Sequence, residues 1–487
     1  MRQRVQIHPS TIIWLTCIAL LLFSTSCSTG STPTVHNTPT AIMPINLTPQ
    51  PTTIPLTPTP RPLLPLQLSS DPYSSTGQYQ TEVEPGAFSY GSTIVTALQA
   101  GRFSNVGSAN IAWATSADSG TTWKNGFLPG TTRLVGGPYD RITDPSVTYD
   151  ARHATWMIAT VVFLALSSGI VAPAVLVSTS TDGGFTWNRP FTIMNADNNG
   201  GLDKDWIACD NTATSPFYGH CYAEWDDYNS NDIIQMSTST DGGRTWGAPK
   251  TTVDAASGLG AAILVQPGGK VVVTMINANQ TAVKVFTSSN GGASWNASVT
   301  VTAATSYPPN VAYRDNILLS SAMDGAGKVY LVWVDCRYEP NCYGNDLVMT
   351  TSTDGRNWQP IHRIPLTQIT SGTYYYVSGL GADPTTSGTT AHLGLTYYYY
   401  AANCASNCPL FVGFVSSVDG GNTWRPPTKL AGPMYATWLP SGNNKVGDYI
   451  ATIFSNGLAF PIFAIGHAPT GGHLNEAMYT MAGGLSL

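Results

Sequence analysis

The sequence predicts an all-β fold built from repeats, and three observations lead to this prediction. A short pattern rich in Ser, Asp, Gly and Trp recurs six times along the 487 residues. An apolar, alternating stretch, typical of a β-strand, precedes its copies. The chain also contains 47 Gly and 34 Pro, which favour many turns and short strands over long helices.

The six copies share the residues that shape a tight turn. They are Ser116–Trp123, Ser180–Trp187, Ser239–Trp246, Ser288–Trp295, Ser352–Trp358 and Ser417–Trp424. An Asp or Asn side chain can accept backbone N–H groups within a turn, glycine permits a positive φ, and the Trp covers the turn as an apolar plug. The residues expected in these structural roles are Asp118, Asp182, Asp241, Asn290, Asp354 and Asp419, with Trp123, Trp187, Trp246, Trp295, Trp358 and Trp424.

This pattern resembles the Asp-box, or BNR repeat, of sialidases and related β-propellers, in which the box joins the third and fourth strands of a blade. The resemblance implies a sialidase-like β-propeller of four-stranded blades. The boxes are about 60 residues apart on average, more than the spacing in WD40 blades, so residues 67–487 would hold about seven units. Seven blades are favoured, and six, the number in sialidases, is the alternative. We expect the last blade to take its fourth strand from residues near 67–80, because this closes the ring and removes free edges.

The N-terminal residues indicate export. Arg2 and Arg4 precede an apolar run over 12–23, and small residues lead to Cys27, which together read as a signal peptide over residues 1–27. The segment resembles the lipobox of bacterial lipoproteins, which implies that Cys27 is acylated; a simple secreted protein is the alternative.

Residues 28–66 are rich in Pro and Thr and predict an extended stalk, followed by the propeller over 67–487. We therefore expect a monomeric cell-surface lipoprotein that meets the membrane only through its N-terminal lipid.

Charge and cysteine content narrow the partners further. The net charge is −6 and only 10% of residues are charged, which argues against a nucleic-acid partner. In an exported chain, closely spaced cysteines indicate local disulfides. The expected pairs are Cys209 with Cys221, Cys336 with Cys342, and Cys404 with Cys408.

Candidate binding residues lie at the start of the first strand of several repeats, where a propeller has its channel mouth. Four repeats place a cation just before an acid there, and the repeats that begin near Gly260 and Val377 lack the pair. The candidates, with one from a strand 2–3 loop on the same face, are Arg141, Lys204, Asp205, Arg314, Asp315, Arg337, Lys445 and Asp448. They could hold an anionic or polyhydroxylated ligand, or could form salt bridges that fix one blade to the next.

The resemblance to sialidases also implies a catalytic set. That family holds the substrate carboxylate with three arginines and uses a tyrosine nucleophile backed by a glutamate, with an aspartate as acid/base. Here Arg141-Ile142-Thr143 is the nearest match to the family's Arg-Ile-Pro motif, although it follows the first box and lacks the proline. The expected catalytic residues are Asp144, Glu224 and Tyr449.

Three functions follow as hypotheses. The chain is a sialidase-like glycoside hydrolase of the exo-sialidase type, a non-catalytic propeller that binds a glycan or a protein, or another lyase or hydrolase on the same scaffold. No cofactor is expected. A weak calcium candidate is the loop with Asp197, Asn199 and Asp203, which lacks the terminal Glu of a calcium loop because Trp206 stands there; a polar turn is the simpler interpretation.

Overall fold

The computed structural model describes residues 63–73, 77–308, 313, 317–401, 403–404, 407–440 and 446–487. All of them lie in the compact unit Arg61–Leu487. The predicted signal peptide with Cys27, most of the stalk, and the candidates Arg314, Asp315 and Lys445 lie outside the described residues. Within that range, no helix is both long enough and apolar enough to cross a bilayer.

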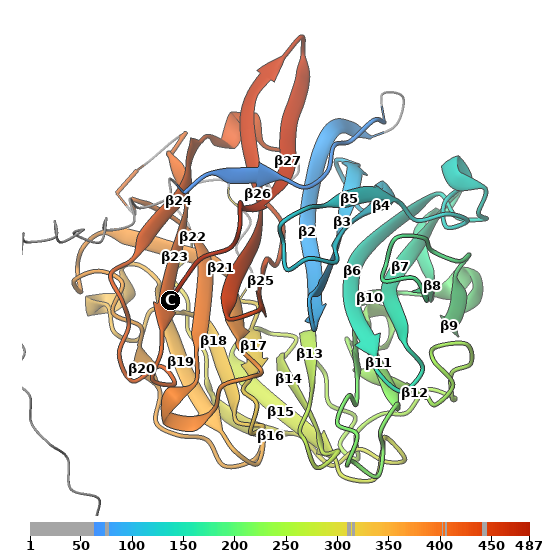
Figure 1. Ribbon diagram of the computed structural model, residues 1–487. Coiled ribbons are helices and arrows are strands. Elements are labelled where there is room, and N and C mark those ends of the chain that lie inside the picture. The colour runs from blue at the N-terminus through green and yellow to red at the C-terminus, as the bar shows by residue number, and fades with distance from the viewer. Residues whose placement is uncertain are drawn as a thin grey trace, which may run out of the picture. The chain divides into compact units, whose positions relative to one another are not determined.

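The predicted all-β fold is confirmed, because strands dominate the described residues and the helices there are short 3-10 turns. The 3-10 turns are Arg133–Val135, Asp197–Asn199, Tyr228–Ser230, Pro340–Cys342, Gly388–Thr390 and Ala436–Trp438. The strands form antiparallel units in chain order (Figure 1), and one-residue pairings join the last, first and second units into one 12-stranded sheet.

The first two units are β2 (Gln78–Tyr90), β3 (Thr93–Arg102), β4 (Ser108–Ser116) and β5 (Lys124–Phe127), then β6 (Arg141–Asp150), β7 (Thr155–Leu166), β8 (Gly169–Ser180) and β9 (Phe191–Asn195). The next two are β10 (Leu202–Cys209), β11 (Cys221–Asp227) and β12 (Gln235–Ser239), then β13 (Leu259–Val265), β14 (Val271–Ile276), β15 (Ala282–Ser288) and β16 (Val299–Ala303). Two more are β17 (Ser320–Met323), β18 (Val329–Asp335), β19 (Asp346–Ser352) and β20 (His362–Arg363), then β21 (Thr373–Ala382), β22 (Leu393–Ala401), β23 (Leu410–Ser417) and β24 (Thr428–Met434).

The last unit combines residues from both ends of the described chain. It contains β25 (Ala451–Ser455), β26 (Leu458–Thr470) and β27 (His473–Met481), and β1 (Pro65–Gln67) pairs antiparallel with β27. An N-terminal strand therefore completes the last unit, as expected, but Pro65–Gln67 forms it rather than residues further into 67–80. The chain already turns toward β2 after β1, because the carboxylate of Asp71 accepts the N–H groups of Tyr73 and Thr81 at 2.8 and 3.2 Å.

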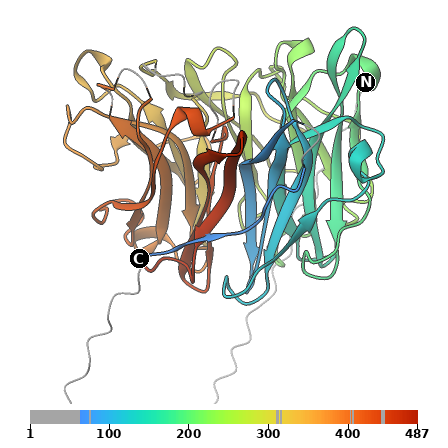
Figure 2. The same cartoon turned by 90° about the horizontal axis from the view of Figure 1, so that it is seen from above.

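The units follow one another around a common centre. The first strand of each unit contacts the first strand of the next, from β2 through β6, β10, β13, β17, β21 and β25, and β25 in turn contacts β2. Figures 1 and 2 both show the blue β2 beside the red C-terminal strands. Side chains on the first strands can therefore meet even when they are distant in sequence.

A buried carboxylate joins β2 to the last unit. Glu82 on β2 accepts a hydrogen bond from the Ser69 hydroxyl at 2.8 Å and from the Met478 N–H at 3.0 Å. Burial raises the pKa of Glu82 to about 8, so the carboxyl is largely protonated at neutral pH. Through these two hydrogen bonds, Glu82 connects β2 both to β27 and to the segment that follows β1.

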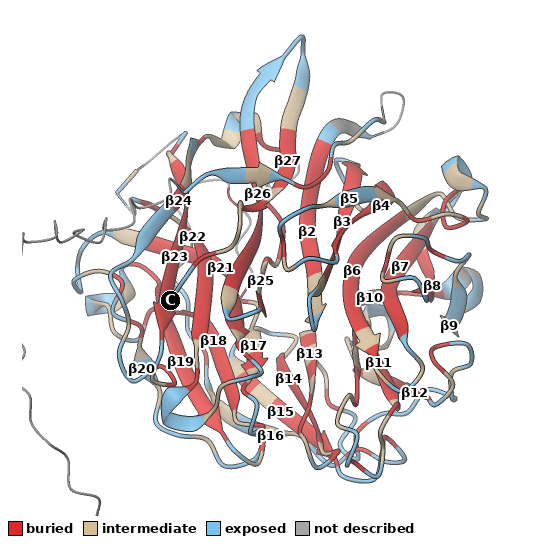
Figure 3. Ribbon diagram, viewed as in Figure 1, coloured by how far each residue is buried: buried red, intermediate tan, exposed pale blue. Residues whose placement is uncertain are grey.

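The tyrosine run at 397–400 belongs to the core. On β22, Tyr397, Tyr398 and Tyr400 are buried, and the Tyr374 ring stacks on Tyr400 at 4.9 Å between centroids. Figure 3 shows the middle of this strand among the buried elements. These tyrosines therefore fill the sheet interior and do not form an exposed platform for sugar rings.

The Asp boxes adopt the expected turn after the third strand of their units. In the second box, Asp182 accepts the Ser180 hydroxyl at 2.7 Å, the Thr186 N–H at 3.0 Å and the Thr186 hydroxyl at 2.6 Å. The Trp187 indole donates to the Gly184 carbonyl at 3.1 Å and is buried. Each box is thus a self-contained hydrogen-bonded turn with an indole packed against it.

The boxes lie at the end of the sheets where the first strands finish. In the first unit, the Ser119 N–H donates to the Ser92 carbonyl in the β2–β3 turn at 2.9 Å. Hydrogen bonds from Thr122 and Ser116 hold the pKa of the exposed Asp118 at about 2. The box carboxylates are therefore ionised and occupied, at the opposite end from the start of the first strands.

The three predicted disulfides are confirmed. They join Cys209 to Cys221, Cys336 to Cys342, and Cys404 to Cys408. Each bridge closes a short loop within one unit, so it stabilises a local connection and not the contact between units.

We predict that Asp182→Ala lowers the free energy of unfolding by about 1–2 kcal/mol at neutral pH, because the Thr186 and Ser180 groups lose their acceptor. Burial is the largest single effect and raises the pKa of Asp182, but the hydrogen bonds of Thr186, Ser180 and Phe185 together outweigh it and lower the pKa from 3.8 to about 2. A lowered pKa gives stability that is present above the ordinary pKa and lost below it. The difference between parent and variant should therefore shrink as the pH falls from about 4 to about 2, as urea unfolding at several pH values would measure.

Arg244→Ala is the matched control, because Arg244 is an exposed residue of the third box whose backbone N–H, kept in the variant, donates to Asp241. A variant at Asp182 no less stable than the Arg244 control would contradict a structural role for the box carboxylate.

Candidate functional site

A β-bulge recurs in the first strand of five units. Its first residue has a left-handed φ between 41° and 56°, and the register with the second strand slips by one residue there. The residues concerned are Glu84, Asp144, Lys204, Gly260 and Val377. Only glycine adopts this conformation without strain, and a bulge changes the direction of its side chain. Three of these strained positions carry a charge.

The charged bulge residues meet at the centre. The Lys204 ammonium lies 2.7 Å from the Asp448 carboxylate and 3.9 Å from Asp144. The Asp448 N–H donates to the Glu84 carboxylate at 3.1 Å, and the Tyr449 hydroxyl donates to Asp144 at 3.4 Å. Residues of four different units thus form one cluster, which we call the central cluster: Glu84, Asp144, Lys204, Asp205, Asp448 and Tyr449.

Burial and charge set the protonation of the central cluster. Burial, with the neighbouring acids, raises the pKa of Asp144 to about 7 although Lys204 opposes this. Burial and Asp144 raise the pKa of Asp205 well above its usual range. Burial alone would lower the pKa of Lys204, but Asp144 and Asp448 raise it well above the usual value. The cluster therefore holds a fixed cation beside a carboxyl that can exchange a proton near neutral pH.

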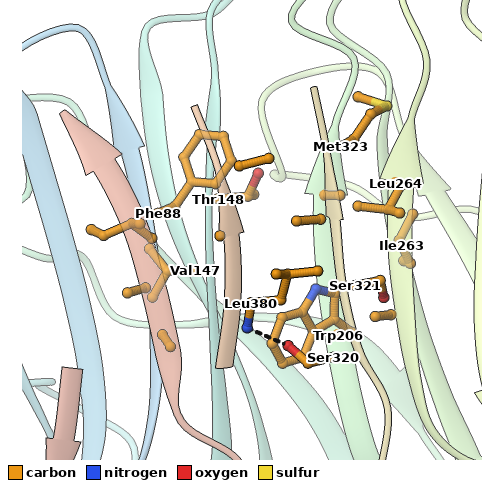
Figure 4. A pocket seen from close by; sticks show the side chains of 18 of the residues that line it. Phe88, Val147, Thr148, Trp206, Ile263, Leu264, Ser320, Ser321, Met323 and Leu380 are labelled. Carbon is orange, nitrogen blue, oxygen red and sulfur yellow. Dashed lines mark hydrogen bonds between the residues drawn. The ribbon is translucent and has the colours of Figure 1, made fainter. Parts of the chain in front are cut away.

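A cavity of about 590 Å³ lies along the first strands, and Asp144, Lys204, Asp205 and Tyr449 line one end of it. Its walls are largely apolar. Figure 4 shows Phe88, Leu264, Met323 and Trp206, from different units, around the same space. The Trp206 ring meets the Tyr449 ring edge-on at 6.0 Å, so it joins the apolar wall to the cluster.

Two further acids lie behind the cluster on β11. Both carboxylate oxygens of Glu224 and of Asp226 are buried without a hydrogen-bond partner among the described residues. Burial raises the pKa of Glu224, with Asp226 and Asp205 adding to the shift. The sequence predicts that Glu224 backs Tyr449 as the nucleophile, whereas the acid that bonds to the Tyr449 hydroxyl in the structure is Asp144. The reason is the bulge, which aims Asp144 at the centre.

The two predicted arginines that the structure describes, Arg141 and Arg337, are held away from the cavity. Arg141 donates to Asn105 at 2.6 Å and to the Val106 carbonyl at 2.9 Å, and its guanidinium stacks on the Phe103 ring at 4.0 Å. Arg337 donates to the Asp335 carboxylate at 2.7 and 2.8 Å. Among the described residues, no arginine lines the cavity, and Lys204 is the cation that does.

The described residues contain no group of three His, Cys, Asp or Glu side chains that could hold a metal ion. At the weak calcium candidate, Asp197 bonds to Asn195 and the Asn199 carbonyl accepts from Asn229 at 2.8 Å. Asp203 lies on the neighbouring strand β10. The loop is arranged as a polar turn.

The repeat connects this chain to known proteins. The four boxes between residues 116 and 295 fall within residues 93–331, which the family model described as a BNR repeat-like domain matches. Two more boxes follow beyond the matched BNR segment. No curated protein matches the chain in sequence.

Solved structures are similar to this chain at low identity. A Hadza microbial sialidase is 15% identical with a TM-score of 0.44, over 83% of this chain and 66% of its own length. An α-L-arabinofuranosidase from Fusarium graminearum is 13% identical with a TM-score of 0.43, over 86% of this chain and 96% of its own. An ulvan lyase, a polysaccharide lyase, is 11% identical with a TM-score of 0.47, over 87% and 96%.

Sequence reasoning found most of the central cluster but missed its bulges and the apolar cavity. A signal for the bulges was present, because Glu84, Asp144 and Lys204 follow one another at intervals of 60 residues. The cavity leaves no comparable signal, since its walls come from alternate residues of strands in different units.

We predict that Lys204→Met destabilises the protein by about 3–5 kcal/mol, because it leaves Asp448 and Asp144 buried without their cation. The double variant Lys204→Met/Asp448→Asn should recover part of this loss, since it also removes the unpaired acid. Thermal and denaturant unfolding of both variants would measure it. A single variant as stable as the parent would show that Lys204 does not neutralise the cluster.

Proposed function

We propose that the repeated units are the blades of a seven-bladed β-propeller that hydrolyses a glycosidic bond at the central cluster. The ring of contacts among the first strands and the pairing of β1 with β27 support seven blades closed by an N-terminal strand. The observation that carries the reaction is Asp144, a buried carboxyl with a pKa of about 7 at the wall of a cavity. Such a group can donate a proton at neutral pH.

In this reaction Asp144 gives its proton to the leaving-group oxygen as the bond from the sugar carbon to that oxygen breaks. Water then bonds to the sugar carbon and loses a proton to a carboxylate. The transition state of glycoside hydrolysis carries positive charge on the sugar ring. The acids of the central cluster outnumber its single cation, so Glu84 and Asp448 favour that charge electrostatically.

Tyr449 acts as a hydrogen-bond partner of Asp144 in this proposal. Burial and the neighbouring acids raise the pKa of Tyr449 well above its usual value, which disfavours the phenolate form that a nucleophile needs. An uncharged glycan suits the described part of the site better than a sialoside, because no described arginine lines it. Sialosides remain an arm of the test, since Arg314 lies outside the described residues.

We predict that the protein hydrolyses chromogenic glycosides of uncharged sugars and that Asp144→Asn lowers kcat/KM by about 100-fold or more. The loss should be larger for an alkyl leaving group than for 2,4-dinitrophenolate, which leaves without a proton. The rate should fall as the pH rises through about 7, because Asp144 must be protonated. A pH–rate profile on each leaving group measures both effects.

Arg141→Ala is the matched control for this assay, because Arg141 is held outside the cavity and should keep parental activity. Turnover of a sialoside with loss in Arg314→Ala would return the chain to the exo-sialidase hypothesis. Absence of hydrolysis of every glycoside by folded protein would overturn the hydrolase proposal in favour of a glycan- or protein-binding propeller.

We also propose that the propeller is exported and tethered through Cys27, at the end of a Pro/Thr-rich stalk. Expression of the full chain in a bacterium should place it in the membrane fraction, and Cys27→Ser should release it to the soluble extracytoplasmic fraction. Metabolic labelling with palmitate should mark the parent alone. A parent that is soluble and unlabelled would contradict the tether.

A further inference from the structure

The cavity continues beyond the central cluster as an apolar space. On β13, Ala262 and Leu264 are half-buried and line the cavity, while Ile263 between them is 3% exposed. This period of two places Ala262 and Leu264 on one face of the strand, the face with the more exposed side chains. The exposed turn residue Tyr90 lines the far end, so the cavity reaches the surface on the side of the Asp boxes.

Several hydroxyl groups in these walls already have partners. Ser89 donates to the Phe454 carbonyl at 2.6 Å, and Ser320 accepts the Leu380 N–H at 2.7 Å, a bond that Figure 4 shows. Ser321 bonds to Thr274 at 2.8 Å. Thr452 donates to the Gly379 carbonyl at 2.7 Å.

The walls therefore offer few free groups to a polar ligand. Among the wall hydroxyls, the Thr148 oxygen is buried without a partner in the described part of the chain. A sugar ring in this space would lose most of its hydrogen bonds to water and regain few from the protein, which is unfavourable. An apolar group would lose nothing of this kind and would gain from burial. The volume lies in the range of small-molecule sites.

We propose that this cavity binds the apolar aglycone of a glycoside, an alkyl or aryl group, while the sugar lies at the central cluster. The inference deepens the proposed hydrolase, on which it rests, by naming the class of substrate. The Asp144 carboxyl then lies at the junction of the two parts, where the bridging oxygen would be. Trp206, between the wall and Tyr449, separates the apolar part from the polar end.

The first experiment measures binding without any turnover. The full chain carrying Cys27→Ser is titrated with N-phenyl-1-naphthylamine, an uncharged apolar fluorophore, and the dye is then displaced with methyl, butyl and hexyl β-D-glucosides. We expect saturable dye binding and displacement that improves about fourfold for each added methylene until the cavity is filled.

Cavity-filling and polar variants place the binding site. Ala262→Trp should fill the space and weaken dye binding about 10-fold or more, and Leu264→Asn should weaken it without adding volume. Ala468→Trp, the same change on the exposed β26–β27 hairpin, should bind the dye as the parent does. Circular dichroism and thermal unfolding show which variants are folded, and Leu264→Asn keeps the test valid if Ala262→Trp does not fold.

The outcomes separate this inference from the hydrolase proposal. Absence of saturable dye binding, or binding that neither cavity variant changes, overturns the aglycone site even if the protein hydrolyses glycosides. Binding that improves with chain length and that both cavity variants weaken supports the apolar site. If the protein shows such binding but hydrolyses no glycoside, only the hydrolase proposal fails.

Discussion

The contact of β25 with β2 brings the last unit beside the first, and the antiparallel pairing of β1 with β27 ties the two ends of the described chain into one unit. The central cluster depends on the contact between the last and first units, because Asp448 comes just before β25 and meets both Glu84 on β2 and Lys204 on β10. Glu82 reinforces this contact, with bonds to Ser69 and Met478. A chain whose last unit lacked β1 would leave an edge of β27 open.

The central cluster combines two unfavourable features that the surrounding sheets sustain. Its bulge residues adopt a left-handed φ that only glycine tolerates well, and its acids are buried beside one another. Strain and burial of this kind persist only where the surrounding structure fixes them, and they gather at functional sites. Lys204 offsets part of the cost by pairing with Asp448. The same burial moves the pKa of Asp144 into the neutral range, so the feature that costs stability also supplies the proton donor.

Polar and apolar surfaces meet at one point of the cavity. The central cluster supplies charged groups and a phenol. The walls along β2, β13 and β25 supply apolar side chains, together with hydroxyls that are already hydrogen-bonded. A molecule with a sugar at one end and an apolar group at the other matches this division. The Asp boxes lie at the far end of the sheets with their carboxylates occupied, so they shape turns and contribute no free acid to the chemistry.

The sequence by itself determined the features that depend on neighbours in the chain. The boxes, the three disulfides and the alternating strands follow from hydrogen bonds and spacings within a few residues, so the all-β fold and the structural role of Asp182 could be read directly. The repeat also showed that Gly260 and Val377 stand where other units have a charged residue at the start of the first strand. Tertiary structure decided which charges meet. Tyr449 bonds to Asp144 across 305 residues, and Arg141 turns aside to Asn105 and Phe103. The physical reason is that contacts between the first strands of different units and the local bulges set the direction of each side chain, and neither can be read from residues that are close in the sequence.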